Sequence, residues 1–238
     1  MASPELTQAE VERCVQGVLR ARRSVRAYRP DPVPRDTVLD ILRCASTAPS
    51  NSNTQPWRVH VLANEPKQAL GEALVAAFDE DRLPPSPHFP DPLPAVFGER
   101  QADFAQRYYE CLGIARDDAA ARARQSRRNF SFFGAPVGLI FTIDARLTRH
   151  SWLDLGLFVQ NVMVAAKARG LDTCPQVSFV RFHTVIASCL SLEPHDVTAC
   201  GMALGFADEQ ACVNQMDVPR QPLEAFVRIH ASFQGEQK

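Results

Sequence analysis

The chain lacks several features that would assign it to a class of protein at once. Its 238 residues carry 26 Lys and Arg against 27 Asp and Glu, so there is no basic excess for a nucleic acid. No apolar run reaches the ~18 residues of a membrane-spanning helix. Residues 1–10 show no basic region followed by an apolar block. We therefore expect no nucleic-acid partner, no membrane association and no secretion signal.

The cysteines and histidines form no framework. The seven cysteines are scattered, their number is odd, and no C-x-x-C occurs. This distribution argues against a disulfide scaffold or a zinc knuckle and favours a reducing, cytoplasmic compartment. The six histidines show no i,i+4 pairing, so we expect no metal site.

The signatures of several large enzyme classes are also missing. There is no G-x-G-x-x-G after a strand, no P-loop, no H-E-x-x-H and no G-x-S-x-G. Without such acid–base or nucleophile motifs, we expect any chemistry to be carried by a cofactor and no side chain to be singled out as catalytic.

The pattern of apolar residues predicts a single α+β domain over 1–238, with few strands wrapped by helices. A capping box, Thr7-x-x-Glu10, starts a first helix that ends near 22–24. Further helices are expected from Pro34, over 66–80, within 97–128, over 152–169 and over 183–190. Strands are expected over 57–63, 136–143, 197–206 and 226–233, and a turn into a short strand over 172–180. Six prolines within 84–94 indicate a surface excursion or lid at about 83–130.

Two polar segments stand out against this background. The first, Arg22-Arg23-Ser24-Val25-Arg26, places three guanidinium groups and a hydroxyl at a helix end. Guanidinium forks match phosphate oxygens, although the same residues also suit a solvated basic turn, which the motif alone favours. The second, Ala48-Pro49-Ser50-Asn51-Ser52-Asn53-Thr54-Gln55-Pro56-Trp57, is a loop of residues that bond locally to backbone.

Taken together, these two segments resemble the nitroreductase family of FMN-dependent NAD(P)H oxidoreductases. The resemblance continues through Gly170-Leu171-Asp172-Thr173-Cys174-Pro175-Gln176 and Pro219-Arg220, and is strongest to the nitrobenzoate reductase branch. It covers the chain from about Val11 to Ile229, except for a nondescript stretch at about 83–128. It implies a nitroreductase-like fold, in which a central, mostly antiparallel sheet is flanked by helices in an intertwined homodimer.

The resemblance also implies where FMN and the partner subunit lie. The cofactor would sit at the dimer interface, and the C-terminal segment would cross to extend the partner's sheet. The alternation of apolar and polar residues over 226–233 is compatible with that exchange, although a strand that pairs within its own subunit would show the same pattern.

The resemblance further implies a set of FMN-binding residues. They are Arg22, Arg23, Ser24 and Arg220 toward the phosphate and ribityl chain, Arg26 near the N1/C2 side of the ring, Pro49, Ser50, Asn51 and Asn53 from the other subunit, and Pro175, Gln176 and Val177 along the N5 edge, with a backbone N–H there. Arg23 replaces the His of many relatives, and Val218 replaces a basic residue of some, which weakens the expected phosphate grip. A permanent cation such as Arg26 would stabilise the negative charge of reduced flavin.

The expected activity moves electrons from NADH or NADPH to a small aromatic acceptor. A nitroaromatic, nitrobenzoate among them, would pass through nitroso to hydroxylamine with ping-pong kinetics. No ribose-reading motif separates the two donors. The alternatives are reduction of a quinone, an enone or a halogenated aromatic, flavin cleavage, a non-enzymatic flavin-binding module, and a thiol enzyme that uses Cys174.

Several other residues have a structural and a functional interpretation. We expect Cys174 to be a buried apolar residue and Trp57 a core anchor, and we give His195-Asp196 little weight as a catalytic pair. Phe130, Phe132 and Phe133 either pack or line an aromatic pocket, and we favour packing. The pair Gln160-Asn161 stays open between polar packing and a dimer or flavin contact. For Arg122, Arg124, Arg127 and Arg128 we favour a solvated helix face over an anion-attracting mouth.

Overall fold

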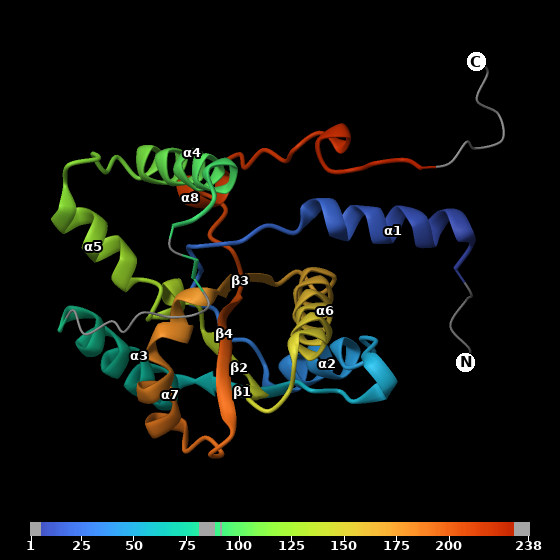
Figure 1. The fold of residues 1–238 in the computed structure, drawn as a ribbon, viewed down its shortest axis with the longest axis horizontal. Helices are drawn as coiled ribbons and strands as arrows, with labels where there is room; N and C mark the ends of the chain where they lie inside the picture. Colours follow the sequence, from blue (N-terminus) through green and yellow to red (C-terminus); the bar gives the residue numbers. More distant parts are fainter. Residues whose placement is uncertain (1–5, 81–88, 91, 231–238) are drawn as a thin grey trace.

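A four-stranded antiparallel sheet forms the centre of the protein in the computed structural model, which describes residues 6–80, 89–90 and 92–230 (Figure 1). The strands β1 (Arg58–Ala63), β2 (Val137–Asp144), β4 (Asp196–Gly205) and β3 (Asp172–Gln176) follow one another in this order across the sheet. The inner strands β2 and β4 are buried nearly throughout, as their continuous apolar runs require. The expected antiparallel sheet is confirmed.

Helices cover both faces of this sheet. The helices of the described residues are α1 (Gln8–Ala21), α2 (Arg35–Ala45), α3 (Asn64–Asp79), α4 (Ala95–Cys111), α5 (Ala119–Arg127), α6 (Arg149–Lys167), α7 (His183–Leu190) and the short α8 (Cys212–Gln215). The 3₁₀ turns are η1 (Asn51–Asn53), η2 (Phe132–Gly134), η3 (Val177–Phe182) and η4 (Leu223–Ala225). Helices α2 and α6 pack on one face, and α3, α7 and η3 on the other (Figure 1).

Each face has its own apolar core. Trp57 lies parallel to Phe158 on the α2/α6 side with ring centroids 4.7 Å apart, so its expected role as a core anchor is confirmed. On the opposite side Phe130, Phe132 and Phe133 are buried in one cluster, which confirms that they pack.

Two strand glycines make room for the second core. A Cβ on Gly138 would lie 2.6 Å from the Phe132 ring, and one on Gly201 would lie 2.8 Å from the Phe179 ring. The aromatic side chains therefore approach the sheet backbone where only glycine leaves enough space.

Several predicted element bounds are wrong. The helical stretch expected over 97–128 is two helices, broken after Cys111, where Gly113 has a φ of +65°. Over 172–180, a turn into a short strand is expected, but the strand comes first, at Asp172–Gln176, and the 3₁₀ turn Val177–Phe182 follows it. The strand expected over 226–233 is absent from residues 226–230, and 231–233 lie outside the described residues. Pairing of this segment with the sheet of a partner subunit stays a prediction.

Part of the predicted excursion is not tested. Of the proline-rich stretch 84–94, residues 84–88 and 91 lie outside the described part of the chain, and α4 begins at Ala95. Among the helices that the structure describes, none is long and apolar enough to cross a bilayer.

Candidate functional site

The segment that follows α1 runs beside strand β3. The backbone N–H of Val25 donates to the carbonyl of Thr173 at 3.0 Å, and Ser24 forms an isolated parallel bridge with the same residue. Val25 is buried. Because side chains alternate along an extended segment, burial of Val25 directs its neighbours Ser24 and Arg26 to the other side.

That other side is a cavity of about 420 Å³ between the end of α1, α4 and α8. Its charged lining consists of Arg20, Arg22, Arg23, Arg26 and Arg220 together with a single acid, Asp217. Ser24, Phe104, Val213, Asn214 and Val218 also line it. The structure therefore brings together the basic segment and the distant Arg220, and the excess of guanidinium groups suits a phosphate.

Arg26 is held by aromatic rings of α4. Its guanidinium carbon lies 5.1 Å from the ring centroid of Phe104 and 5.4 Å from that of Tyr108, and it donates to the Ser24 carbonyl at 3.2 Å. The Tyr108 hydroxyl accepts from Gln125 Nε2 at 2.6 Å, and burial raises the pKa of this phenol. Neutral rings orient a cation without cancelling its charge, so Arg26 keeps its charge at the cavity.

Asn214 of α8 links the chain segments that form this wall of the cavity through hydrogen bonds. Its Oδ1 accepts from the backbone N–H of Arg26 at 2.8 Å, and its Nδ2 donates to the carbonyls of Ala27 and Asp208 at 2.7 and 2.8 Å. The Asn214 carbonyl accepts from the Arg23 guanidinium at 2.9 Å. Sequence reasoning missed Asn214, Phe104 and Tyr108, since none of them belongs to a local motif.

The end of β3 supplies polar atoms that lack partners. Among the described residues, the buried Thr173 Oγ1, Gln176 Oε1 and Ser178 Oγ have no hydrogen-bond partner, although Gln176 Nε2 donates to the Asn129 carbonyl at 2.7 Å. Buried polar groups are nearly always satisfied, so three in one short segment fit a polar ligand there. Pro175 pairs with Met202 of β4, and Val177 is exposed at the start of η3.

The polar loop lies apart from this cavity and packs on α6. The Asn51 N–H donates to the buried carboxylate of Asp154 at 3.1 Å, and Ser50 Oγ accepts from the Gln55 N–H at 3.0 Å. Ser52, Asn53 and Gln55 have φ values of +50°, +58° and +47°, so this loop stores backbone strain of the kind found at functional sites.

Two groups of predicted site residues do not line the arginine cavity: the loop residues Pro49, Ser50, Asn51 and Asn53, and the segment Pro175, Gln176 and Val177 at the end of β3. The β3 segment is linked to the basic segment through Thr173, whereas the loop is not. A contribution from a second subunit stays a prediction.

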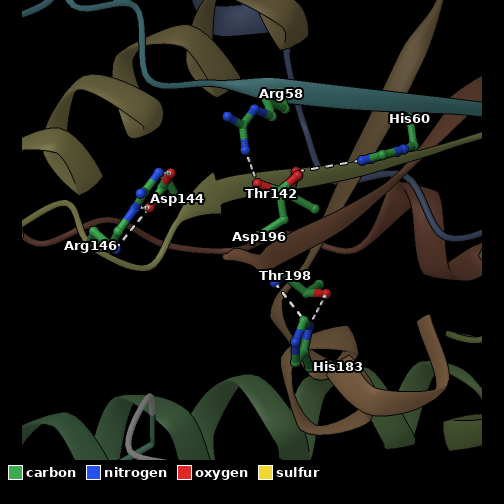
Figure 2. Close-up of polar contacts among 8 residues, drawn as sticks. All are labelled: Arg58, His60, Thr142, Asp144, Arg146, His183, Asp196 and Thr198. Atoms are coloured by element: carbon green, nitrogen blue, oxygen red, sulfur yellow. Dashed lines mark hydrogen bonds and ion pairs between the residues drawn. The ribbon is translucent and has the colours of Figure 1, made fainter. Parts of the chain in front are cut away.

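The side chains considered for other kinds of catalysis, and those around them, are buried or make structural contacts. Burial raises the pKa of Cys174 to about 11, so the thiol is protonated at neutral pH, as expected of a buried apolar residue. Asp196 forms an ion pair with Arg58, and His183 Nδ1 lies 3.1 Å from the Thr198 hydroxyl (Figure 2). These contacts join β1, β4 and α7 at the start of β4, away from the cavity.

Three of the remaining residues with two interpretations make contacts within the chain. Arg127 Nε donates to Asp79 at 2.6 Å, and the Arg122 guanidinium lies 3.8 Å from the Tyr109 ring centroid. Asn161 Nδ2 donates to the Ala45 carbonyl at 3.4 Å, which supports polar packing for that residue.

Comparison with known proteins gives consistent matches. The nitroreductase family model matches residues 19–206. The chain is 49% identical to "4-nitrobenzoate reductase" of Pseudomonas putida over 212 residues, which is 89% of this chain and 93% of that protein. It is 42% identical to "Nitrobenzene nitroreductase" of Ectopseudomonas oleovorans over 215 residues, 89% of this chain and 95% of that one.

A solved structure is similar throughout. The FMN-dependent nitroreductase NfnB from Mycobacterium smegmatis, in complex with NADPH, matches with a TM-score of 0.89 at 33% identity, over 93% of this chain and 100% of that chain.

Proposed function

Because the chain belongs to the nitroreductase family, we propose that it is an FMN-dependent oxidoreductase that moves electrons from NADH or NADPH to a nitroaromatic acceptor, with nitrobenzoate as the first candidate. The observation that carries this proposal is the arginine-lined cavity. Its residue Ser24 forms a bridge with Thr173 of β3, whose buried hydroxyl has no hydrogen-bond partner. The 49% identity to a 4-nitrobenzoate reductase supports the acceptor.

Different residues bind different parts of FMN in this proposal. Arg22, Arg23, Ser24 and Arg220 bind the phosphate and ribityl chain, and Arg26, fixed on its aromatic rings, stabilises negative charge at the N1/C2 side of the ring. The segment Pro175, Gln176 and Val177 borders the N5 edge. When bound, FMN supplies the hydride acceptor and electron donor of the reaction. The side chains orient, exclude water and provide charge, and none acts as an essential acid.

A homodimer completes the site in this proposal. Helix α1 buries no residue of its own, and Val15 on it is 52% exposed. Phe226 and Ile229 near the C-terminus are 67% and 65% exposed. A second copy that covers these apolar side chains would also bring the loop of Pro49, Ser50, Asn51 and Asn53 over the flavin. We place the enzyme in the cytoplasm, in line with its scattered cysteines.

The excursion at about 83–130 acts as a lid on the single domain in this proposal. It carries α4, which presents Phe104 to the cavity, and α5. We favour a solvated helix face for its arginines at 122, 124, 127 and 128; in the alternative interpretation they attract an anionic acceptor. Equal salt dependence of kcat/KM for nitrobenzoate and uncharged nitrobenzene contradicts this role.

An anaerobic acceptor panel tests the proposed activity. With NADH or NADPH as donor, nitrobenzoate should give the hydroxylamine faster than a quinone, an enone or a chlorinated aromatic is reduced. Initial-rate plots should run parallel, since donor and acceptor use one cleft in turn. Intersecting plots contradict ping-pong kinetics, and faster reduction of another acceptor class reassigns the substrate.

Two alternatives to the proposed function predict different experimental results. A flavin that neither NADH nor NADPH reduces would point to a non-enzymatic flavin-binding module. Loss of activity in Cys174→Ala would support a thiol enzyme, whereas we expect this variant to stay nearly as active as the parent.

A further inference from the structure

A pair of cysteines joins α4 to α8. Cys111 is the last residue of α4 and Cys212 the first of α8, and the two thiol groups interact. Cys111 Sγ also donates to the Tyr108 carbonyl at 3.3 Å. Cys212 is exposed and Cys111 half-buried, so reagents reach the pair from solvent.

Packing on both sides keeps the two thiols together. Cys111 lies against the buried cluster of Tyr108 and Val213, and Ala211 packs on the same cluster. The residues on either side of Cys212 are therefore anchored to the end of α4. Because protein interiors are closely packed, these anchored neighbours limit how far the two cysteines can move apart.

The pair connects the two elements that hold Arg26. Helix α4 supplies the rings of Phe104 and Tyr108 beneath its guanidinium, and α8 supplies Asn214, which binds its backbone N–H. A covalent link between Cys111 and Cys212 would fix these two walls of the cavity relative to each other.

We propose that Cys111 and Cys212 form a reversible disulfide when the protein meets a peroxide. The Cys212 thiol loses its proton, the thiolate attacks a peroxide oxygen, and the O–O bond breaks. A sulfenic acid and hydroxide result, and the hydroxide takes up the released proton to become water. The Cys111 sulfur then attacks the Cys212 sulfur, and the hydroxyl leaves as a second water. Two thiols lose two electrons and two protons, and the peroxide becomes two water molecules. A small dithiol reverses the reaction by thiol–disulfide exchange.

The order of the two steps follows from the surroundings of each thiol. Burial and the hydrogen bond with Cys212 raise the pKa of Cys111 to about 11, so this thiol is protonated at neutral pH and reacts second. Ring closure should accordingly become faster as the pH rises.

The other cysteines lack this arrangement. Cys14, Cys44 and Cys189 are exposed on α1, α2 and α7, and Cys174 and Cys200 are buried in the sheet. The structure therefore predicts one intramolecular link, between α4 and α8.

Peptide mapping of the full-length protein tests the inference. The protein is treated with hydrogen peroxide at neutral pH, its free thiols are alkylated under denaturing conditions, and the digest is analysed by mass spectrometry without reduction. We expect a linked Cys111–Cys212 peptide, lost after dithiothreitol, and formed on the order of tenfold faster than any link that involves Cys189. The Cys189→Ser control should form it equally well.

Two variants make the result decisive. In Cys212→Ser, Cys111 should stay alkylatable after peroxide; in Cys111→Ser, Cys212 should proceed to sulfinic acid. Full alkylation of Cys111 in the treated parent protein, or links only between chains through Cys14, Cys44 or Cys189, would overturn the proposal. The mapping needs neither bound FMN nor turnover, so its failure is separate from failure of the proposed function.

Discussion

At the scale of single residues, the site depends on which arginines keep their charge accessible. Arg127 is paired with Asp79, whereas Arg26 is held by neutral rings at the cavity wall. The family resemblance pointed to Arg22, Ser24, Arg26 and Arg220, and their guanidinium and hydroxyl groups suit a phosphate. The sequence could not point to Phe104 and Tyr108, which orient Arg26, because aromatic residues on a helix face are also typical of an ordinary apolar core.

Replacement of Arg22 by Ala should weaken FMN binding. A charge-assisted hydrogen bond is worth about 1.5–3 kcal/mol, which corresponds to roughly 10- to 150-fold in the dissociation constant. Fluorescence titration of FMN with the apoprotein measures the change. Arg13→Ala, on an exposed part of α1 outside the cavity, is the matched control. Equal affinities of the two variants would contradict the assignment.

Two histidines should make the fold less stable in mild acid. Burial lowers the pKa of His183, and burial with the nearby charge of Arg58 lowers that of His60 (Figure 2). The unfolded chain, with a His pKa of ~6.5, then binds protons more readily than the fold, so the free energy of unfolding falls as the pH drops through this value. Urea unfolding at about pH 7.5 and pH 5.5 measures it.

The double variant His60→Gln/His183→Gln should lose less stability than the parent protein between the two pH values. His150→Gln, at an exposed position of α6, should behave as the parent does. An unchanged difference in the double variant would show that these two side chains do not carry the effect.

At the scale of elements, local signals predicted most of the fold. The Thr7 capping box starts α1, the bounds of α7 agree, and Gly170, with a φ of +74°, follows α6 where a terminating glycine was expected. The break after Cys111 has a local signal in Gly113, whose φ is +65°, which the helical pattern over 97–128 obscured. The 3₁₀ turn after Gln176 was not predictable, because it buries Phe179 and Phe182 in a core built from distant parts of the chain.

The short helix α8 should contribute more to stability than its length indicates. Asn214→Ala removes the hydrogen bonds to Arg26, Ala27 and Asp208, and leaves buried backbone groups without partners. An unsatisfied buried group costs about 1–3 kcal/mol, so we expect a loss of about 2 kcal/mol or more in urea unfolding. The exposed neighbour Gln215→Ala should cost far less; equal losses would refute the role of Asn214.

At the scale of the whole molecule, one chain contains only part of the expected site. The arginine cavity lies at the end of α1, whereas the strained loop at Ser50–Gln55 packs on α6. Both α1 and the C-terminal segment extend from the sheet with apolar side chains uncovered (Figure 1). The family resemblance in the sequence anticipated this division; composition and periodicity alone did not.

A charge on the apolar face of α1 should separate the subunits. Val15→Glu places a carboxylate where the partner is proposed to pack, and burying an unpaired charge is costly. Sedimentation velocity should show a dissociation constant raised on the order of tenfold or more, with bound FMN lost in parallel. Gln16→Glu adds the same charge to the exposed next residue and should leave the dimer intact. A monomeric parent protein would contradict the dimer itself.

The most direct test of the account is the absorption spectrum of the purified, FMN-reconstituted protein during anaerobic titration with NADPH and with NADH. We predict a yellow protein that binds FMN at one per chain and whose flavin absorbance is bleached by at least one of the two donors, then restored by nitrobenzoate. A colourless protein with no measurable affinity for FMN after reconstitution would contradict the central claim.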